Sequence, residues 1–348
     1  MSTLERLVHI DALRGLAVLL MVMVHAAATW NPMEANAPPT LLAYMVSGLG
    51  GLAAPLFVTL FGWGLAQRSI GWNQRLRTAA FLLVCQLVVN ISAPHLFEPW
   101  TPGVLSLFAV LMLTHPVWSW PWRREKNSHQ TFLAFVLVLF VVHFLLQPYW
   151  GPSEWEARVH TPDLTTLAAH LALTGTYPLL PWVVFAALGT AIAHTPSPNE
   201  NESAMLQLFG FGLLLSSGIL AYTIHAGRVW ARPTGDAFLT FFPANLPFLV
   251  AALTGTVLLW LLSLHLSHLS VLSDVGRCSL SVYVGHFVPF VWMASLDEQY
   301  GWSLNISMFF TLGYTFGWVV LGTLWHRHAR SWTLESVMRT IASSSKNG

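Results

Sequence analysis

The stretch that decides the fold is VHIDALRGLAVLLMVMVHAAATW, residues 8–30. A hydrocarbon core about 30 Å thick needs roughly 20 apolar residues of helix, and this run is long enough to cross it. It nevertheless contains Asp11, Arg14 and His25. Ionisable groups at membrane depth are costly unless they are paired or wetted, so they usually mark a site or a buried ion pair. We interpret the stretch as an uncleaved transmembrane helix.

The composition extends this interpretation to the whole chain. Of its 348 residues, 55% are apolar and only 9% are charged, whereas soluble domains are about 25% charged. The sequence therefore predicts an all-α, polytopic transmembrane helix bundle with membrane lipid around it. The net charge of +1 gives no reason to expect a nucleic-acid partner. Cys85 and Cys278 are too few for a disulfide framework or a zinc site, and we expect no metal.

Apolar runs of spanning length divide the chain into about ten predicted helices, at roughly 10–30, 46–67, 75–94, 102–119, 130–148, 176–194, 204–224, 244–267, 277–295 and 303–325. No repeat and no long polar linker is visible. We therefore expect one integral membrane domain over residues 1–348. It would include a short amphipathic or re-entrant helix at about 163–174 and a polar C-terminal tail at about 331–348.

The basic residues predict the orientation. With the N-terminus inside, alternating the ten helices puts twelve of the sixteen Lys and Arg residues in inner segments and three in outer ones. Cytoplasmic loops carry such an excess of positive charge. The sequence thus predicts a multi-pass protein of the plasma (inner) membrane with both termini in the cytoplasm.

Helix one carries the first candidate site. Asp11 and Arg14 are three residues apart and can meet on one helix face. They fit either a structural ion pair or a site in which Arg14 reaches an anionic group. Arg14, Val18, Met21 and His25 form one stripe about 16 Å long. This stripe favours a polar track, although a lone buried His is often only a hydrogen-bonded core residue.

The segment SDVGRCSLSVYVGHFVPF, residues 273–290, repeats the arrangement with Asp274, Arg277 and His286. His286 needs a hydrogen-bond partner at that depth because lipid offers none, and Ser279, Ser281 and Tyr283 could supply it. We take His25 and His286 as candidate catalytic residues. The candidate substrate- or donor-binding residues are Asp11, Arg14, Arg277, Asp274 and Tyr283. We expect them to line one cavity formed by predicted helices one, two and nine.

Four segments occur in the order typical of one family: HIDALRGLAVLLMVMVH, APLFVTLFGWGLA, PLLPWVVFAALGTAIA and GRCSLSVYVGHFV. Over roughly residues 6–295 the chain resembles the bacterial relatives of heparan-alpha-glucosaminide N-acetyltransferase. The resemblance implies an acyltransferase of the cell envelope, with no bound cofactor and with acetyl-CoA or another acyl-CoA as co-substrate. It implies transfer from the cytosolic side to the amine or hydroxyl of a sugar or glycolipid, with a His as acyl acceptor or base and an Arg holding a CoA phosphate.

One departure keeps alternatives open. The family's active His lies in the loop after helix one, and the comparable loop here, NPMEANAPPT at residues 31–40, has none. Either His25 or His286 takes that role, or the acceptor attacks the donor directly, or the chain works differently. The alternatives are a transporter of a small anionic solute or lipid and a non-catalytic partner of another envelope enzyme. The sequence leaves the acyl donor, the acceptor and the oligomeric state open.

Overall fold

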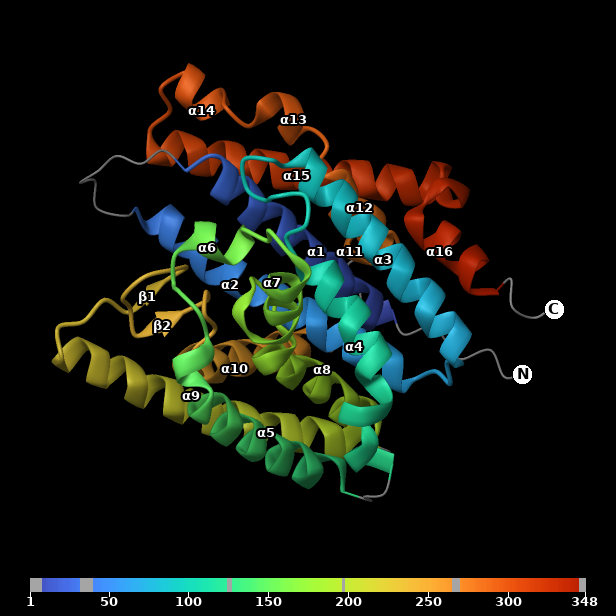
Figure 1. Ribbon diagram of the computed structural model, residues 1–348, viewed down its shortest axis with the longest axis vertical. Coiled ribbons are helices and arrows are strands. Elements are labelled where there is room, and N and C mark those ends of the chain that lie inside the picture. The colour runs from blue at the N-terminus through green and yellow to red at the C-terminus, as the bar shows by residue number, and fades with distance from the viewer. Residues whose placement is uncertain (1–7, 32–39, 124–126, 196–197, 265–269, 344–348) are drawn as a thin grey trace. The chain divides into compact units, whose positions relative to one another are not determined.

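We analysed a computed structural model of the chain. It describes residues 8–31, 40–123, 127–195, 198–264 and 270–343. Within these residues the protein is a helix bundle with a single pair of two-residue strands, as the composition predicts (Figure 1). The chain divides into two compact units, and each is described by itself.

The first unit comprises residues 1–57 and 259–341. Its elements are α1 (Val8–Thr29), the first part of α2 (Leu41–Ala66), the end of α10 (Leu246–Ser263), α11 (Ser270–Gly276), α12 (Ser279–Gly285), α13 (Phe290–Met293), α14 (Leu296–Gln299), α15 (Leu304–His328), the 3-10 helix η4 (Arg330–Trp332) and α16 (Leu334–Ser343). Helix α1 is buried along most of its length and packs against α11, α12 and α15. The helix that carries the first candidate site therefore forms the core of this unit.

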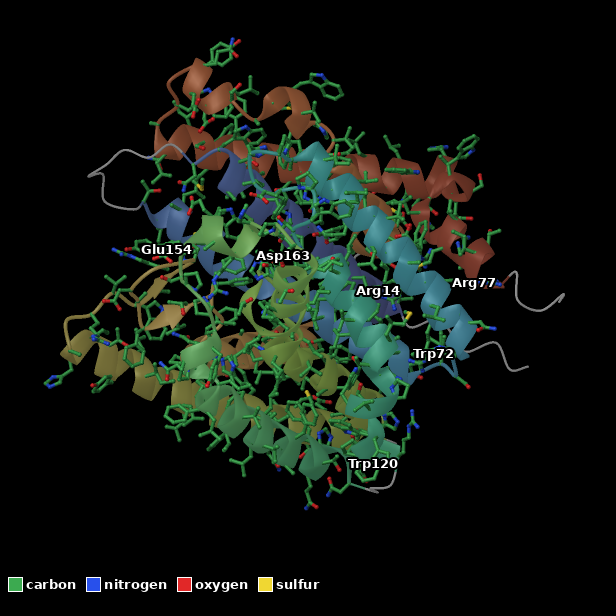
Figure 2. All side chains as sticks on the ribbon, viewed as in Figure 1. Arg14, Trp72, Arg77, Trp120, Glu154 and Asp163 are labelled. Atoms are coloured by element: carbon green, nitrogen blue, oxygen red, sulfur yellow. The ribbon has the colours of Figure 1, made fainter. Side chains whose placement is uncertain are left out.

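The second unit comprises residues 58–258 and 342–348. Besides parts of α2 and α10 it contains α3 (Trp72–Ser92), α4 (Val104–Trp118), the 3-10 helices η1 (Trp120–Arg123) and η2 (Gln147–Tyr149), α5 (Ser128–Leu145), α6 (Trp155–Val159), α7 (Leu164–Ala169), the π-helix η3 (His170–Thr174), α8 (Leu179–Ala193), α9 (Pro198–His225), β1 (Ala231–Arg232) and β2 (Leu239–Thr240). The strands are parallel, with Ala231 opposite Leu239. Figure 2 shows the side chains, including the largely exposed Trp72 and Trp120 beside the loops that join these helices.

Each of the ten predicted spans is occupied by helix. Eight of the described helices are long and apolar enough to cross a membrane, and a ninth span results if Leu164–Thr174 and Leu179–Ala193, which meet at 48°, count as one. The remaining predicted span, α4, has only 15 residues. The polytopic fold is therefore confirmed. Whether the chain crosses the membrane ten times depends on whether α4 spans it.

The predicted ninth span is not one continuous helix. Helix α12 ends at Gly285 and is followed by turns and the short helices α13 and α14, although Ser279–Gln299 as a whole is long and apolar enough to span. Pro289 lacks the N–H that would bond to the carbonyl of Gly285, and its ring clashes there. His286 therefore lies at the C-terminal end of a short helix, next to a break.

The segment at residues 150–175 is held by a buried arginine. Arg158 donates from Nη1 to the carbonyls of Thr174 and Gly175 (2.9 and 3.1 Å) and from Nη2 to the carbonyl of Trp150 (3.0 Å). Its side chain is buried, and this burial lowers the pKa of Arg158 to about 10. The guanidinium thus ties both ends of the segment at residues 150–175 together, which is a structural role.

Close helix packing in the second unit depends on glycine. A Cβ atom at Gly62 would lie 2.2 Å from the carbonyl oxygen of Ala186, and one at Gly189 would lie 1.9 Å from that of Thr59. Side-chain-free positions let two helix backbones approach each other in this way. The Gly-containing motifs at residues 54–69 and 175–194 therefore join α2 to α8.

Candidate active site

The two predicted catalytic histidines meet. His25 Nδ1 lies 3.0 Å from His286 Nε2, and the two rings stack with their centroids 5.2 Å apart. His25 comes from α1, whereas His286 follows the last residue of α12. Both residues are buried, with 8% and 0% of their surface exposed. A direct His–His contact between distant parts of the chain is more specific than either histidine alone.

The hydrogen bonds define which ring nitrogens carry protons. His286 Nδ1 lies 3.2 Å from the carbonyl oxygen of Val282. A carbonyl only accepts, so His286 Nδ1 is the donor and, in the neutral ring, its Nε2 is an acceptor. His25 Nδ1 must then donate to His286 Nε2. In the neutral His25 ring this leaves Nε2 with its lone pair, ready to act as a base or a nucleophile.

Aromatic rings surround the histidine pair. Phe287 lies 4.6 Å from the His25 ring and 4.0 Å from the His286 ring, measured between centroids. Tyr283, a predicted substrate-binding residue, contacts both histidines edge-on at 6.0 and 5.7 Å. The hydroxyl of Tyr314 on α15 donates to the carbonyl oxygen of His286. These contacts restrict both imidazoles to the orientation in which they bond to each other.

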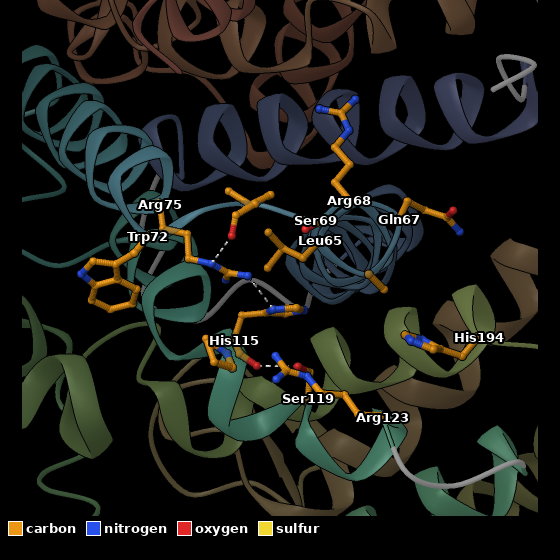
Figure 3. A pocket seen from close by; sticks show the side chains of 13 residues that line it. Leu65, Gln67, Arg68, Ser69, Trp72, Arg75, His115, Ser119, Arg123 and His194 are labelled. Atoms are coloured by element: carbon orange, nitrogen blue, oxygen red, sulfur yellow. Dashed lines mark hydrogen bonds between the residues drawn. The ribbon is translucent and has the colours of Figure 1, made fainter. Parts of the chain in front are cut away.

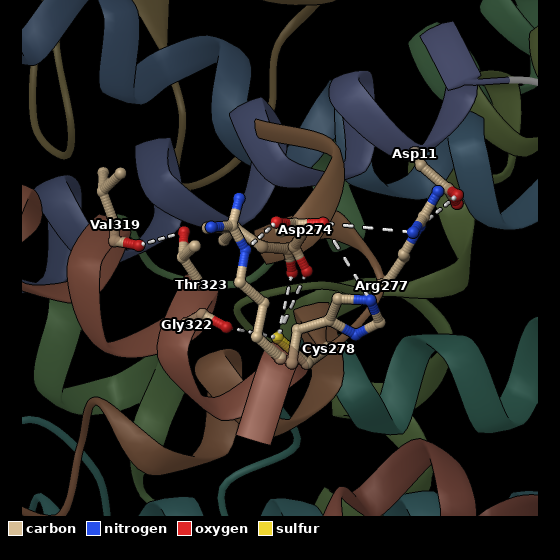
Figure 4. A network of polar contacts seen from close by, with 10 residues as sticks. Asp11, Asp274, Arg277, Cys278, Val319, Gly322 and Thr323 are labelled. Atoms are coloured by element: carbon tan, nitrogen blue, oxygen red, sulfur yellow. Dashed lines mark hydrogen bonds and ion pairs between the residues drawn. The ribbon is translucent and has the colours of Figure 1, made fainter. Parts of the chain in front are cut away.

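The predicted ion pairs also join into one network, drawn in Figure 4. Asp11 accepts from Arg14 Nη1 at 3.4 Å and from Arg277 Nε at 3.3 Å. Asp274 lies 3.9 Å from Arg277 Nη1 and accepts from Arg327 Nε at 2.8 Å. Each Asp–Arg pair of the sequence is therefore present, and Asp11 additionally links α1 to the segment after α11. Among the described residues, three arginines thus contact two aspartates in this network.

Glycine positions these charges. A Cβ atom at Gly276 would lie 1.8 Å from the carbonyl oxygen of Asp11, and one at Gly15 would lie 2.0 Å from that of Leu272. No side chain fits at either place, so α1 and α11 touch backbone to backbone. Asp11, Arg14 and Arg277 are direct or near neighbours of these two glycines. The glycines of DALRG and GR thus explain why the charged residues of the two motifs meet.

The structure therefore brings together all seven predicted site residues within the first unit, in two groups. His25, His286 and Tyr283 form one group, and Asp11, Arg14, Asp274 and Arg277 form the other. One expectation was wrong, because His286 bonds to His25 and Val282, whereas Ser281 bonds to Glu335. The loop that we compared with the family's catalytic loop falls almost entirely at 32–39, outside the described residues.

Glu335 is a contact residue of this region that the sequence did not predict. It lies in α16, within the segment that we expected to be a polar tail, and it reaches the N-terminal end of α12. Its carboxylate accepts from the amides of Leu280 (2.6 Å) and Ser281 (3.4 Å) and from the Ser281 hydroxyl (2.6 Å). Burial raises the pKa of Glu335. Only the placement of Glu335 at the start of an amphipathic segment could have pointed to it.

Residues 6–227 match the model described as heparan-alpha-glucosaminide N-acetyltransferase, catalytic. The chain belongs to this family. No curated protein matches it in a direct sequence comparison. Membership of the heparan-alpha-glucosaminide N-acetyltransferase family makes the chain a multi-pass, acetyltransferase-like membrane protein.

The family match covers only part of the candidate site. Asp11, Arg14 and His25 fall within residues 6–227, whereas Asp274, Arg277, Tyr283 and His286 lie beyond them. The second half of the site is therefore connected to the family region by geometry, through the bonds that Arg277 and His286 make to α1.

Proposed function

We propose that the chain is an integral membrane acyltransferase of the cell envelope. It would transfer an acetyl or other acyl group from a cytosolic CoA donor to the amine or hydroxyl of an envelope sugar or glycolipid. The observation that carries this proposal is the bond between His25 Nδ1 and His286 Nε2. Together with the Val282 bond it leaves His25 Nε2 unprotonated, and a neutral imidazole is a competent nucleophile or base near neutral pH.

The pair supports a balanced acyl transfer. His25 Nε2 attacks the thioester carbonyl, the C–S bond breaks and the CoA thiolate leaves. As the new C–N bond forms, the proton on His25 Nδ1 moves to His286 Nε2, so that neutral acyl-His25 stands beside a protonated His286. The acceptor amine or hydroxyl then attacks the acyl carbon. Its proton ends on the CoA thiolate, and His286 returns the proton to His25 Nδ1 as the C–N bond breaks.

The charged network suits the other end of the donor. The side chains of Arg14 and Arg277 are about one-third exposed, and planar guanidinium groups bind phosphate well. Arg14 and His25 are about 16 Å apart along α1. Acyl-CoA carries its phosphates and its thioester at opposite ends of an extended molecule. Donor phosphates near Arg14 and Arg277 would leave the thioester free to reach towards His25.

The proposal also includes the location. The twelve inner and three outer basic residues support a plasma (inner) membrane protein with both termini in the cytoplasm. In that orientation the Asp11 network lies towards the cytosolic end of α1. His25 lies towards the far end, where an envelope acceptor is available. Because both rings are buried, transfer requires the surrounding side chains to move.

The test uses the purified full-length protein in detergent, acetyl-CoA and glucosamine-type acceptors, with CoA release as the readout. We expect His25→Ala to lose about 10²- to 10⁴-fold of the rate, the usual contribution of a reacting acid–base group. His286→Gln keeps an acceptor near the position of Nε2 and should retain more activity than His286→Ala. The control is His328→Ala, which removes an exposed imidazole at the end of α15.

Mass spectrometry of protein quenched after mixing with the donor separates the two roles of His25. An acyl group on His25 supports the covalent route, and its absence with retained turnover supports His25 as the base for direct attack. If wild-type protein releases no more CoA than the His25→Ala, His286→Ala double variant, acyl transfer is refuted. Uptake of an unmodified solute into proteoliposomes would then support a transporter.

A further inference from the structure

A pocket of about 590 Å³ lies in the second unit, and its lining residues do not include either histidine of the pair. It is formed where α2 ends, α3 begins, and α4 and α8 end (Figure 3). The described residues that line it include Arg68, Arg75, Arg123, His115 and His194, and none of them is an Asp or Glu. A pocket lined by cationic groups without acidic partners favours an anionic occupant.

Arg75 has a structural role in this pocket. Its Nε donates to the carbonyl of Ile70 (3.1 Å) and its Nη1 to the carbonyl of Met112 (2.8 Å). Its Nη2 lies 3.2 Å from His115 Nδ1. Because a guanidinium only donates, His115 Nδ1 accepts, and the neutral His115 ring carries its proton on Nε2. Arg75 thereby orients His115 and defines its tautomer.

His115 Nε2–H is the observation that points to a ligand. His115 is 8% exposed and lines the pocket, and no described residue accepts a hydrogen bond from its Nε2. A buried donor without an acceptor destabilises the folded protein. Such a cost is removed when a bound group supplies the acceptor. An oxygen atom of an anion in the pocket would do so.

Two further features favour a phosphate group over a simple halide. The N-terminal end of α3 borders the pocket at Ile70 and Trp72, and α3 begins without a side-chain cap and without an acidic residue in its first turn. The free amides and the dipole of a helix N-terminus bind phosphate oxygens. Arg68 and Arg123 line the same pocket, and guanidinium groups can each bind two oxygens of one phosphate.

We propose that this pocket, defined by Arg68, Arg123 and the Nε2–H of His115, is a binding site for a phosphate group of a lipid headgroup or of a soluble phosphorylated compound. The site shares no residue with the proposed acyl-transfer site, and the proposal does not depend on the proposed function. The lining residues between α2 and α3, after α4 and after α8 belong to segments that the distribution of basic residues predicts to be inner. Phosphate from the cytosol or from the inner leaflet would therefore reach it.

The first experiment uses the full-length protein in a non-ionic detergent, with inorganic phosphate as the probe. Its unfolding temperature is measured against phosphate concentration and compared with sodium chloride at equal ionic strength. Phosphate should stabilise the wild type more than chloride does. The double variant Arg68→Gln, Arg123→Gln should bind phosphate about tenfold to a hundredfold more weakly, since hydrogen bonds to charged groups contribute about 1.5–3 kcal/mol. His115→Asn keeps an acceptor for Arg75 but lacks Nε2–H and should lose about tenfold.

Arg77→Gln is the matched control, because Arg77 is an exposed arginine of α3 that does not line the pocket. It should respond to phosphate like the wild type. The second experiment places the same variants in nanodiscs with phosphatidic acid or with phosphatidylcholine alone and counts retained lipids by native mass spectrometry. Retention of phosphatidic acid that the double variant loses identifies a lipid headgroup, whereas a phosphate response without such retention identifies a soluble compound. Equal behaviour of wild type, double variant and Arg77→Gln in both experiments would overturn the proposal.

Discussion

At the residue scale, the chemistry that a buried histidine can perform depends on which of its ring nitrogens is left without a hydrogen-bond partner. The Val282 carbonyl sets the tautomer of His286, which in turn sets that of His25, so the chain of bonds ends in a lone pair on His25 Nε2. In the second unit, Arg75 sets the tautomer of His115 in the same manner, and there the bonds end in an unused N–H. The first arrangement suits an electrophile, and the second suits an anion.

Glu335 gives a residue-scale prediction for pH. Burial raises the pKa of Glu335 above the value of roughly 4.3 of an unfolded chain. The folded protein therefore binds more protons at this site than the unfolded protein between those two pKa values. Its contribution to stability is present in full below the unfolded pKa and declines as pH rises through the folded pKa.

The measurement compares the unfolding temperature of wild type with that of Glu335→Gln from pH 4 to pH 8. Gln keeps an oxygen acceptor for Leu280 and Ser281 but does not titrate, so the other carboxylates cancel in the difference. Wild type should lose stability relative to Glu335→Gln as pH rises. Glu335→Ala should be less stable than Glu335→Gln by about 1–2 kcal/mol, as for the loss of a helix cap. A difference that is constant or grows with pH would contradict the assignment.

At the element scale, glycine contacts decide which helices can carry the site. The approach of α1 to α11 requires Gly15 and Gly276 to lack side chains. It places Asp11 where Arg277 can reach it. The interruption after α12 has a similar effect, because Pro289 ends the helix and leaves His286 at its C-terminal boundary beside α1. The two motifs thus supply both the charged residues and the glycines that let α1 and α11 pack backbone to backbone.

The variant Gly276→Ala tests the contact between α1 and α11. The added Cβ would overlap the backbone of α1, and backbone cannot move aside as a flexible side chain can. We expect a loss of about 1–3 kcal/mol, as for other overpacking substitutions, and a similar loss for Gly15→Ala. Gly313→Ala is the control, since nothing lies within 4 Å of its added Cβ and Ala is a better helix former by up to about 1 kcal/mol. Unfolding temperatures in detergent measure the effect. Equal tolerance of Gly276→Ala and Gly313→Ala would contradict the backbone contact.

At the scale of the whole molecule, hydropathy predicted the fold class and the places of the apolar helices, because lipid requires long apolar helices, although the ninth predicted span is interrupted after Gly285. Spacing along a helix also placed Asp11 beside Arg14. The link from Asp11 to Arg277 and the bond from His25 to His286 could not be predicted from spacing, since they join residues more than 260 positions apart. Glu335 was missed for the same reason. Its role depends on a helix that is distant in the sequence.

The count of spans depends on α4, whose 15 residues cover only about 22 Å. Two contacts indicate that α4 nevertheless runs back along the full length of α3. Near its start, the Thr101 carbonyl accepts from Asn90 Nδ2 near the end of α3, and near its end His115 meets Arg75 near the start of α3. Residues 101–103 are buried as well and extend the crossing segment. We therefore expect five crossings between Ser69 and Asp236.

Cysteine labelling checks this expectation. Ser69→Cys and Asp236→Cys are exposed positions on opposite sides of those five crossings. The native Cys85 and Cys278 are both buried, so the wild type serves as an unlabelled control. A membrane-impermeant maleimide added to intact cells should label the Asp236→Cys variant, whereas it should label the Ser69→Cys variant only after the membrane is permeabilised. The reverse pattern would invert the orientation. Labelling of both from one side would mean an even number of crossings, and α4 would then be the helix that does not span.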